Sequence, residues 1–503
     1  MLALSFFAKL RVFCFQNMHS RLLKILFINL LLAVALFSIA NGFTFFVDAS
    51  SSDSTATPTG DTTNSVGQRS YSFDEIVVTA IRSPLSRLDS PSRVQQIGAE
   101  EIQASSEKNL GELLTGKTGI LVRHYGVGGS LQTASFRGMS AEHSVVLLDG
   151  IPIGNVQTGL TDLSLISLGN VESIELVRGG SSAQYGSDAL GGAINILTHS
   201  TSKLPFVRLD ASTSSVGAQR LGVTSQLPFS DELNVRLGSA VEYGRGDFAF
   251  TIQDGARRVD ASRSGSDFRS RHLFVKGSWK PSQQTHTSFM LSSYNVDRGT
   301  PGPVLSVANQ GTARQSDEQL QASVSLQTQM SEELQLSVAA NVQNAYERYV
   351  DRFGVFSADN YYRNILTTVQ SNLHYSFSPN LVLHPGVEVG QATATGNSLE
   401  GDQSRTHAAL YLGGEFHSDL VPFRISVYPS LRYDNYSSIG NAVSPKLGLN
   451  VRYASDAANS LTTFGLALHS TLGKNFRAPT FNELYYAGSG GRGNLNLNPE
   501  HSM

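Results

Sequence analysis

Apolar and polar residues alternate with a period of two along most of the chain after residue 204. In residues 320–327, for example, every second side chain is Leu, Ala or Val and the side chains between them are Gln or Ser. This alternation is typical of β-strands that have one apolar face and one polar face. Segments of about ten residues with this pattern are long enough to cross a bilayer as tilted strands. We count about 13 such segments between residues 204 and 475, which predicts a large antiparallel sheet.

The connections between these segments fall into two classes. Short polar turns lie at residues 229–231, 280–282, 331–332, 378–380 and 456–458. Long connections alternate with them, at residues 244–271, 297–317, 350–361, 391–404, 435–444 and from 475 onward. A soluble β-sandwich would show the same alternation within each strand. Short turns at one end and long loops at the other are typical of an outer-membrane barrel, so we favour the barrel.

The N-terminal region, residues 1–40, has the pattern of a secretory signal. Basic residues occur at Lys9, Arg11, Arg21 and Lys24, and an apolar run follows over residues 25–40. That run is shorter than the about 20 residues a spanning helix needs, and it ends in small residues. We expect cleavage near Ala40 or after Ala49, with an uncleaved anchor as the alternative. Translation starting at Met18 would give a signal of normal length, and with either start the single cysteine, Cys14, is removed.

A Ser- and Thr-rich linker, residues 41–73, offers no apolar core and is predicted to be a flexible tether. It leads into seven residues with a β-prone centre, Asp74, Glu75, Ile76, Val77, Val78, Thr79 and Ala80. An extended segment at the end of a tether suits β-augmentation, in which it pairs with the sheet edge of a partner. An ordinary short strand is the alternative.

Residues 81–200 differ from the rest of the chain because they are rich in glycine and mix two periodicities. Helices are expected at residues 98–103 and 108–115. Strands are expected at residues 144–148, 171–178 and 193–198, the first of them followed by a turn. A mixed α/β unit of this length can bury a core of its own, so we predict a separate domain here, followed by the barrel domain at 201–503.

Charge and composition exclude several functions. The chain carries 38 Lys and Arg against 41 Asp and Glu, and four of the basic residues lie in the first 40, so the remainder has a net charge of −7. Such an acidic protein is a poor candidate for binding nucleic acid. After residue 41 no apolar run is long enough for a spanning helix, which leaves a soluble periplasmic protein or a β-barrel.

Catalytic and metal-binding patterns are weak, and we expect neither an enzyme nor a bound cofactor. The 12 histidines are scattered without a spacing suited to zinc. Four aspartates in one long connection could bind Ca²⁺, although a solvated acidic loop is the stronger interpretation: Asp247, Asp254, Asp260 and Asp267. The glycines at 126–129 lack the Lys-Ser/Thr of a phosphate-binding loop.

Four blocks in the glycine-rich domain resemble, in order, the plug domain of TonB-dependent outer-membrane receptors. They are residues 136–139 (FRGM), 146–152 (LLDG within VLLDGIP), 171–179 (VESIELVRG) and 183–196 (AQYGSDALGGAINI). Residues 475–480 and 494–500 are similar to a conserved barrel region of the same family, and residues 74–80 are similar to its TonB box. Within the family, the chain looks most like cobalamin and ferric-siderophore receptors. One departure is Gly180, where the family usually has proline.

The resemblance implies a fold class that is mainly β, with an antiparallel barrel of about 22 strands closed by an α/β plug. The sequence stops after about 13 strands, so we expect missing C-terminal strands. The implied function is import of a scarce chelate, a ferric siderophore or cobalamin. Import would be energised through TonB and its inner-membrane complex by a monomer in outer-membrane lipid. A passive channel or a ligand-binding surface receptor that uses the same barrel is the alternative.

The resemblance also suggests roles for individual plug residues. Cargo would contact the plug apex at Tyr125, Gly126, Gly128, Ser130, Gln132, Asn155 and Gln157. A buried ion network between plug and barrel is expected from Arg137, Glu172, Glu175 and Arg178, with a switch that transmits the pull of the tether as the alternative interpretation.

Overall fold

The computed structural model describes residues 77–78, 85–86, 89–126, 129–201, 203–215, 217–254, 257–300, 313–352, 357–420, 423–454, 465–488 and 491–503. The predicted signal and tether lie outside these residues. So do most of the predicted partner-binding segment (Asp74, Glu75, Ile76, Thr79 and Ala80) and one apex residue, Gly128.

The plug is built on a five-stranded mixed sheet with the order β3-β8-β9-β6-β7. Its strands are β3 (Arg93–Ile97), β6 (Ser144–Leu148), β7 (Ile151–Ile153), β8 (Val171–Arg178) and β9 (Gly192–Thr198). Only β6 and β9 run parallel within this sheet. Helices α3 (Ala99–Ala104) and α4 (Leu110–Leu114) precede a separate hairpin of β4 (Ile120–His124) and β5 (Gln132–Phe136). The predicted helices and strands of this domain are therefore confirmed, with small shifts at their ends.

The core of the plug lies between its sheet and the two helices. Ile97, Leu110, Leu114, Ile174 and Ile194 are completely buried in one cluster. The interior strands β8 and β9 are buried along nearly their whole length, which explains why they are rich in Val, Ile and Leu instead of alternating strictly. Burial of each large side chain contributes about 1.5–3 kcal/mol, so the plug has enough core to form a unit of its own.

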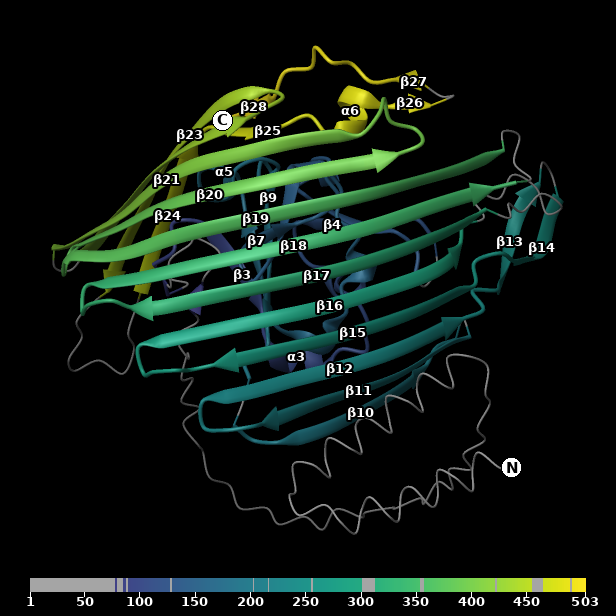
Figure 1. The fold of residues 1–503 in the computed structure, drawn as a ribbon, viewed down its shortest axis with the longest axis horizontal. Coiled ribbons are helices and arrows are strands. Elements are labelled where there is room, and N and C mark those ends of the chain that lie inside the picture. The colour runs from purple at the N-terminus through teal and green to yellow at the C-terminus, as the bar shows by residue number, and fades with distance from the viewer. Residues whose placement is uncertain are drawn as a thin grey trace, which may run out of the picture. The chain divides into compact units, whose positions relative to one another are not determined.

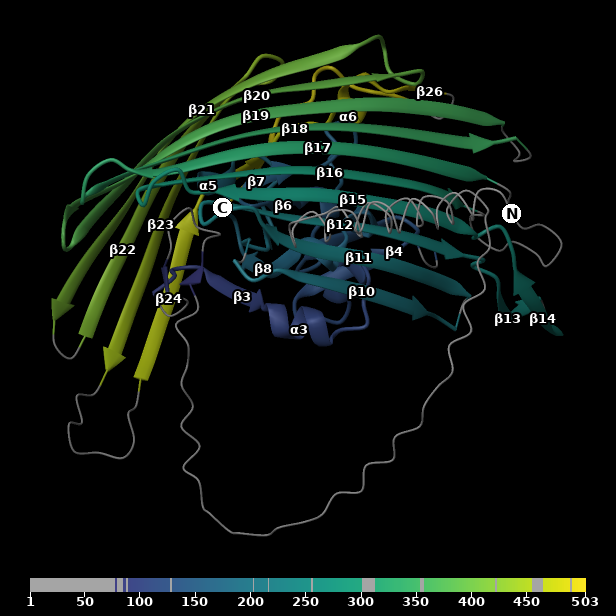
Figure 2. The same ribbon diagram turned by 60° about the horizontal axis from the view of Figure 1, so that its bottom comes forward.

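A single antiparallel sheet of 13 strands packs against the plug, as the count of alternating segments predicted. The strands, in spatial order, are β10 (Phe206–Thr213), β11 (Ala218–Pro228), β12 (Leu233–Gly244), β15 (Phe268–Trp279), β16 (Thr285–Gly299), β17 (Arg314–Gln329), β18 (Leu334–Asp351), β19 (Ala358–Ser378), β20 (Leu381–Gly396), β21 (Gln403–Leu420), β22 (Phe423–Tyr436), β23 (Gly440–Ala454) and β24 (Gly465–Gly473). The sheet curves over the plug and is not closed by the described strands (Figure 2).

The two faces of this sheet differ as the sequence pattern predicted. On β21, Leu410 and Leu412 are more than half exposed, whereas Tyr411 between them is buried. On β22, Leu431 is half exposed and the neighbouring Arg432 is completely buried. The apolar face is therefore turned outward, where a bilayer would cover it, and the polar face is turned toward the plug.

Short elements occupy the connections. Strands β13 (Phe248–Asp254) and β14 (Arg257–Arg263) form a hairpin outside the main sheet, in a segment expected to be a loop (Figure 1). Cross-strand pairs such as Thr251 with Asp260, joined by a 2.8 Å hydrogen bond, stabilise this hairpin.

After β24, β25 (Asn475–Arg477) pairs with β28 (Glu500–Ser502), and β26 (Ala487–Gly488) pairs with β27 (Gly491–Arg492). Two short helices, α5 (Ser182–Tyr185) in the plug and α6 (Phe481–Tyr485) after β25, complete the described elements that matter for the site. Among the helices of the described residues, none is long and apolar enough to span a membrane.

Candidate functional site

The plug loop that follows β7 has a conformation fixed by its own sequence. The side-chain oxygen of Asn155 accepts hydrogen bonds from the backbone N–H groups of Gln157 and Thr158, at 2.9 and 3.3 Å. Gly159 has a φ of +72°, and a Cβ there would come within 2.8 Å of the Thr480 methyl group. The turn therefore requires glycine at 159 and brings the loop against the segment after β25. We call residues 153–162 the apex loop.

Helix α6 is joined to the apex loop by hydrogen bonds. The backbone N–H of Asn482 donates to the carbonyl of Gln157 at 2.9 Å, and the Gln157 side-chain amide donates to the Asn482 side-chain oxygen at 3.0 Å. The N–H of Phe481 donates to the carbonyl of Val156 at 3.4 Å. Gln157 is 2% exposed, so this predicted apex residue acts inside the protein, where it fixes the loop.

Helix α6 was not singled out by the sequence analysis, although the sequence contains a signal for it. The Thr480 hydroxyl accepts from the N–H of Glu483, and the Glu483 carboxylate accepts from the N–H of Thr480, which makes a capping box. Burial raises the pKa of Glu483, but the hydrogen bonds from Thr480 and Arg477 outweigh it and hold the pKa below its usual value.

The other predicted apex residues divide into exposed and buried ones. Tyr125 is 60% exposed and Gly126 is exposed as well, so both are available to a ligand. Ser130 and Gln132 are buried, and the backbone N–H of Gln132 donates to Asp162 at 3.1 Å. The structure thus brings Gln132 to the base of the apex loop and leaves Tyr125 at the surface.

Two cavities flank the apex loop. One, of about 160 Å³, lies between the loop and the strands β16 to β19, and its lining includes Asp162, Arg298, Asp317 and Glu347. The other, of about 180 Å³, lies between the loop and the strands β19 to β22, and its lining includes Asp188. Burial raises the pKa of the Asp188 carboxyl, against the smaller opposing effect of its hydrogen bond from Ser187. The apex loop therefore lies between two cavities.

Arg298, near the end of β16, links the barrel wall to the plug. Its guanidinium contacts the carboxylates of Asp162 at 3.0 Å and of Asp317 at 2.6 Å, and it donates to the carbonyl of Gly129 at 2.6 Å. The side chain is 2% exposed. Removal of one partner from a buried ion pair of this kind costs about 3–5 kcal/mol, because the other charge is left without compensation.

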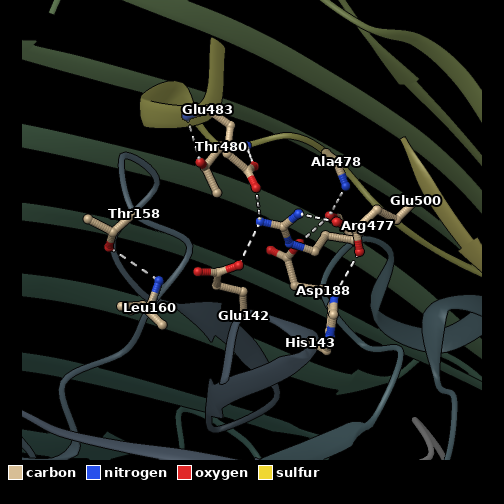
Figure 3. A network of polar contacts seen from close by, with 11 residues as sticks. Glu142, His143, Thr158, Leu160, Asp188, Arg477, Ala478, Thr480, Glu483 and Glu500 are labelled. Carbon is tan, nitrogen blue, oxygen red and sulfur yellow. Dashed lines mark hydrogen bonds and ion pairs between the residues drawn. The ribbon is translucent and has the colours of Figure 1, made fainter. Parts of the chain in front are cut away.

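A second link is centred on Arg477 of β25 (Figure 3). Its guanidinium contacts Glu142 of the plug at 3.0 Å, Glu483 of α6 at 2.8 Å and Glu500 of β28 at 2.9 Å. His143 of the plug lies 2.7 Å from Glu500. One buried guanidinium therefore joins the plug, α6 and β28.

Two further ion pairs join plug to barrel. Asp149 lies 3.6 Å from Lys276 of β15, and Asp89 lies 3.0 Å from Arg452 of β23. With Asp162 and Glu142, these pairs place plug carboxylates against basic residues at four separate places around the described wall. The sequence analysis did not single out any of these carboxylates, because each partner lies more than 100 residues away in the chain.

The four plug residues predicted to form an ion network occupy other environments. Arg178 donates to the side chain of Gln95 and to the carbonyl of Thr118, and burial, with Arg93 and Arg137 nearby, lowers its pKa. Glu175 is buried and accepts from Asn195 at 2.9 Å. Glu172 accepts from the N–H of Ser200 at 2.8 Å, and Arg137 is exposed with a φ of 51°. These partners, Gln95, Thr118, Asn195 and Ser200, all belong to residues 81–200 and not to the strands of the 13-stranded sheet.

The calcium candidates have separate partners. Asp247 lies 3.7 Å from Arg245, Asp260 accepts from Thr251, and Asp267 lies 3.1 Å from Arg314. Asp254 belongs to β13, and its side chain lies outside the described part. Within the described ranges no group of three or more His, Cys, Asp and Glu side chains is placed to hold a metal ion.

The described part of the predicted partner-binding segment is extended. Val77 and Val78 form β1, which pairs in antiparallel register with β2 (Leu85–Ser86). A β conformation of these two residues agrees with the β-prone sequence.

Comparison with known proteins identifies the class. Residues 86–193 match the family model of the TonB-dependent receptor plug domain, and residues 258–503 match that of the TonB-dependent receptor-like β-barrel. The chain belongs to the TonB-dependent receptor family, whose members are β-barrel proteins of the outer membrane.

Particular relatives narrow the comparison. The chain is 27% identical over 449 residues to the vitamin B12 transporter BtuB of Photobacterium profundum, with 86% of this chain and 66% of the relative covered. It is 26% identical over 440 residues to BtuB of Vibrio cholerae, with 85% and 66% covered. The chain thus spans 66% of the length of these relatives.

Solved structures support the same fold. A mutant of the ferric enterobactin receptor PfeA from Pseudomonas aeruginosa gives a TM-score of 0.62 at 17% identity, covering 85% of this chain and 69% of that one. The siderophore receptor PirA from the same organism gives 0.58 at 19% identity, covering 81% and 69%.

Proposed function

We propose that this protein imports a scarce chelated nutrient, cobalamin or a ferric siderophore, across the outer membrane with energy supplied through TonB. The names of the relatives support both cargo classes: the sequence relatives are vitamin B12 transporters, and the similar structures are siderophore receptors. Family membership supports energy coupling, in which TonB and its inner-membrane complex act on residues 74–80.

The observation that carries the proposal is the attachment of the plug to the wall. Arg298 and Arg477, both 2% exposed, hold plug carboxylates at the apex and beside α6. Removing one partner of a buried ion pair such as Arg298–Asp162 costs about 3–5 kcal/mol, and Arg477 adds contacts to partly exposed carboxylates, so displacing the plug requires work. Passage of a large chelate requires work on the plug, which a passive channel does not supply.

The proposed coupling uses main-chain pairing. Strand addition by Asp74–Ala80 to a sheet edge of TonB would transmit force along the chain into the plug through main-chain hydrogen bonds. Cargo binding at the exposed apex residues Tyr125 and Gly126, with Asn155 and Gln157 fixing the apex loop, would signal that the receptor is loaded.

The test is uptake of labelled cobalamin and of a ferric siderophore by cells that carry the full-length gene with Val77→Pro. Proline removes the N–H needed for pairing and should abolish import while cargo still binds. Val77→Ile, which keeps the N–H, is the matched control and should import normally. Unchanged import by the proline variant would show instead a diffusive channel, and binding without import by the parent would show a surface receptor.

A further inference from the structure

The cavity of about 160 Å³ beside the apex loop is lined by several carboxylates and by Arg298. Asp317 of β17 and Glu347 of β18 stand directly opposite each other in the strand register and both line the cavity. Like charges directly opposite on neighbouring strands destabilise a sheet unless something compensates them. Asp162 and Glu318 bring two more carboxylates to the same lining.

Arg298 forms ion pairs with two of these four carboxylates, Asp162 and Asp317. One of its terminal nitrogens contacts both Asp162 and Asp317, and the other donates to the carbonyl of Gly129. The Nε of Arg298 is buried without a hydrogen-bond partner, but the charge of the group is already shared between two carboxylates. Glu347 adds a further carboxyl acceptor to the cavity lining, opposite Asp317.

A neutral acceptor on the next strand points to the same ligand chemistry. Asn364 of β19 is 4% exposed and lines the cavity, and its side-chain oxygen is buried without a hydrogen-bond partner. Its amide nitrogen, by contrast, donates to Gln157 of the apex loop at 3.5 Å. A buried acceptor without a donor costs about 1–3 kcal/mol, which a ligand donor would recover.

We propose that this cavity recognises a hydrogen-bond-donating or cationic group of the cargo, such as a carboxamide N–H₂ or an ammonium, through Glu347 and Asn364. This inference rests on the proposed import function and specifies its cargo. A polyanionic chelate would meet the carboxyl oxygens of this lining and would be disfavoured. Because Asn364 also contacts Gln157, a ligand bound in the cavity would directly affect the apex loop.

The test measures the affinity of the purified full-length receptor for three probes. They are cobalamin, which carries carboxamides, a cationic ferric trihydroxamate with a free ammonium, and a trianionic ferric tris-catecholate. We expect the parent to bind a donor-bearing probe more tightly than the tris-catecholate. Glu347→Gln and Asn364→Leu should each weaken that binding on the order of 10-fold, because each removes one acceptor from a desolvated site.

Charge reversal gives the opposite expectation. Glu347→Lys should weaken the donor-bearing probes further and improve the tris-catecholate. Glu332→Gln, in the exposed turn between β17 and β18, is the matched control and should change nothing. Resistance of the purified barrel to protease shows that each variant is folded.

The outcomes separate this inference from the proposed function. If Glu347→Gln, Asn364→Leu and Glu347→Lys all bind the three probes like the parent, the cavity does not contact cargo and the inference is overturned. In that case, import that is abolished by Val77→Pro would still support the proposed import function. If the parent binds the tris-catecholate more tightly than the other two probes, the inference is overturned directly. If the parent binds none of the chelates, the proposed import function is contradicted.

Discussion

Gln157 and Asn482, 325 residues apart in the chain, bind each other through both main chain and side chain. The N–H of Asn482 donates to the Gln157 carbonyl at 2.9 Å, and the Gln157 amide donates to the Asn482 side chain at 3.0 Å. The apex loop of the plug is thereby attached to α6, a helix that lies outside the 13-stranded sheet. Movement of the plug must break this attachment or carry α6 with it.

A double-mutant cycle would measure this attachment. Gln157→Leu and Asn482→Ala should each destabilise the plug by about 1 kcal/mol, because each removes one buried hydrogen bond. The double variant should lose less than the sum, since the side chains share that bond. The measurement is denaturant unfolding of the purified receptor. Strict additivity would show that the side-chain contact contributes nothing.

Arg298→Met should loosen the plug strongly. It leaves Asp162 and Asp317 buried without their cation, and we expect a loss of about 3–5 kcal/mol. Hydrogen exchange of the backbone at residues 129–132 and 162–164 should become faster. Arg314→Met is the control, because that arginine pairs with Asp267 at 43% side-chain exposure. The control should cost less than about 1 kcal/mol, and equal effects of the two variants would contradict the structural role of Arg298.

Two glycines with similar backbone conformations allow the cost of backbone strain to be measured separately from the cost of a steric clash. Gly150 and Gly159 have φ values of +80° and +72°, but an added Cβ meets nothing within 4 Å at Gly150 and meets Thr480 at 2.8 Å at Gly159. Gly150→Ala should cost about 1 kcal/mol from its backbone conformation alone. Gly159→Ala should cost about 1–3 kcal/mol more, because it pushes the apex loop off α6. Unfolding midpoints of the two variants, compared at one denaturant, test this difference.

Acid should destabilise the junction between plug and barrel through His199. Burial, with Arg236 nearby, lowers the pKa of this imidazole from 6.5 to about 4. As the pH falls, the unfolded chain therefore binds a proton at this histidine before the folded protein does. The free energy of unfolding consequently decreases between about pH 6.5 and pH 4. His199→Gln should remove this part of the pH dependence. The test measures the free energy of unfolding of the parent and of the variant at pH 7.5 and at pH 4. If the variant loses as much stability between these two pH values as the parent does, the assignment to His199 is contradicted.

The fold was predictable because it rests on local patterns. Period-two alternation identified the 13 strands, and the apolar positions of β6, β8 and β9 identified three of the five strands of the plug sheet, whereas β3 and β7 were not predicted. The β13–β14 hairpin was missed, because it lies within the long connection at residues 244–271 and its two strands pair only with each other. Alternation cannot distinguish such a hairpin from a long polar loop.

The site was predictable only in part. Asn155 and Gln157 of the apex loop were among the apex residues that the family resemblance suggested. The ion pairs of Arg298 with Asp162 and of Arg477 with Glu142 leave no local signal, because they depend on which side chains meet across the lumen. The capping box of Thr480 and Glu483 was readable in the sequence and would have located α6, although not its partner.

The contacts of Arg298 with two plug loops have a consequence for genetics. Gly129 and Asp162 belong to different plug loops, yet both bind the same guanidinium. A disturbance of either loop therefore reaches the other through one residue of the wall. Substitutions in the two loops should therefore give similar phenotypes in a mutational scan. These phenotypes should be attributed to the contact with Arg298 that both loops share.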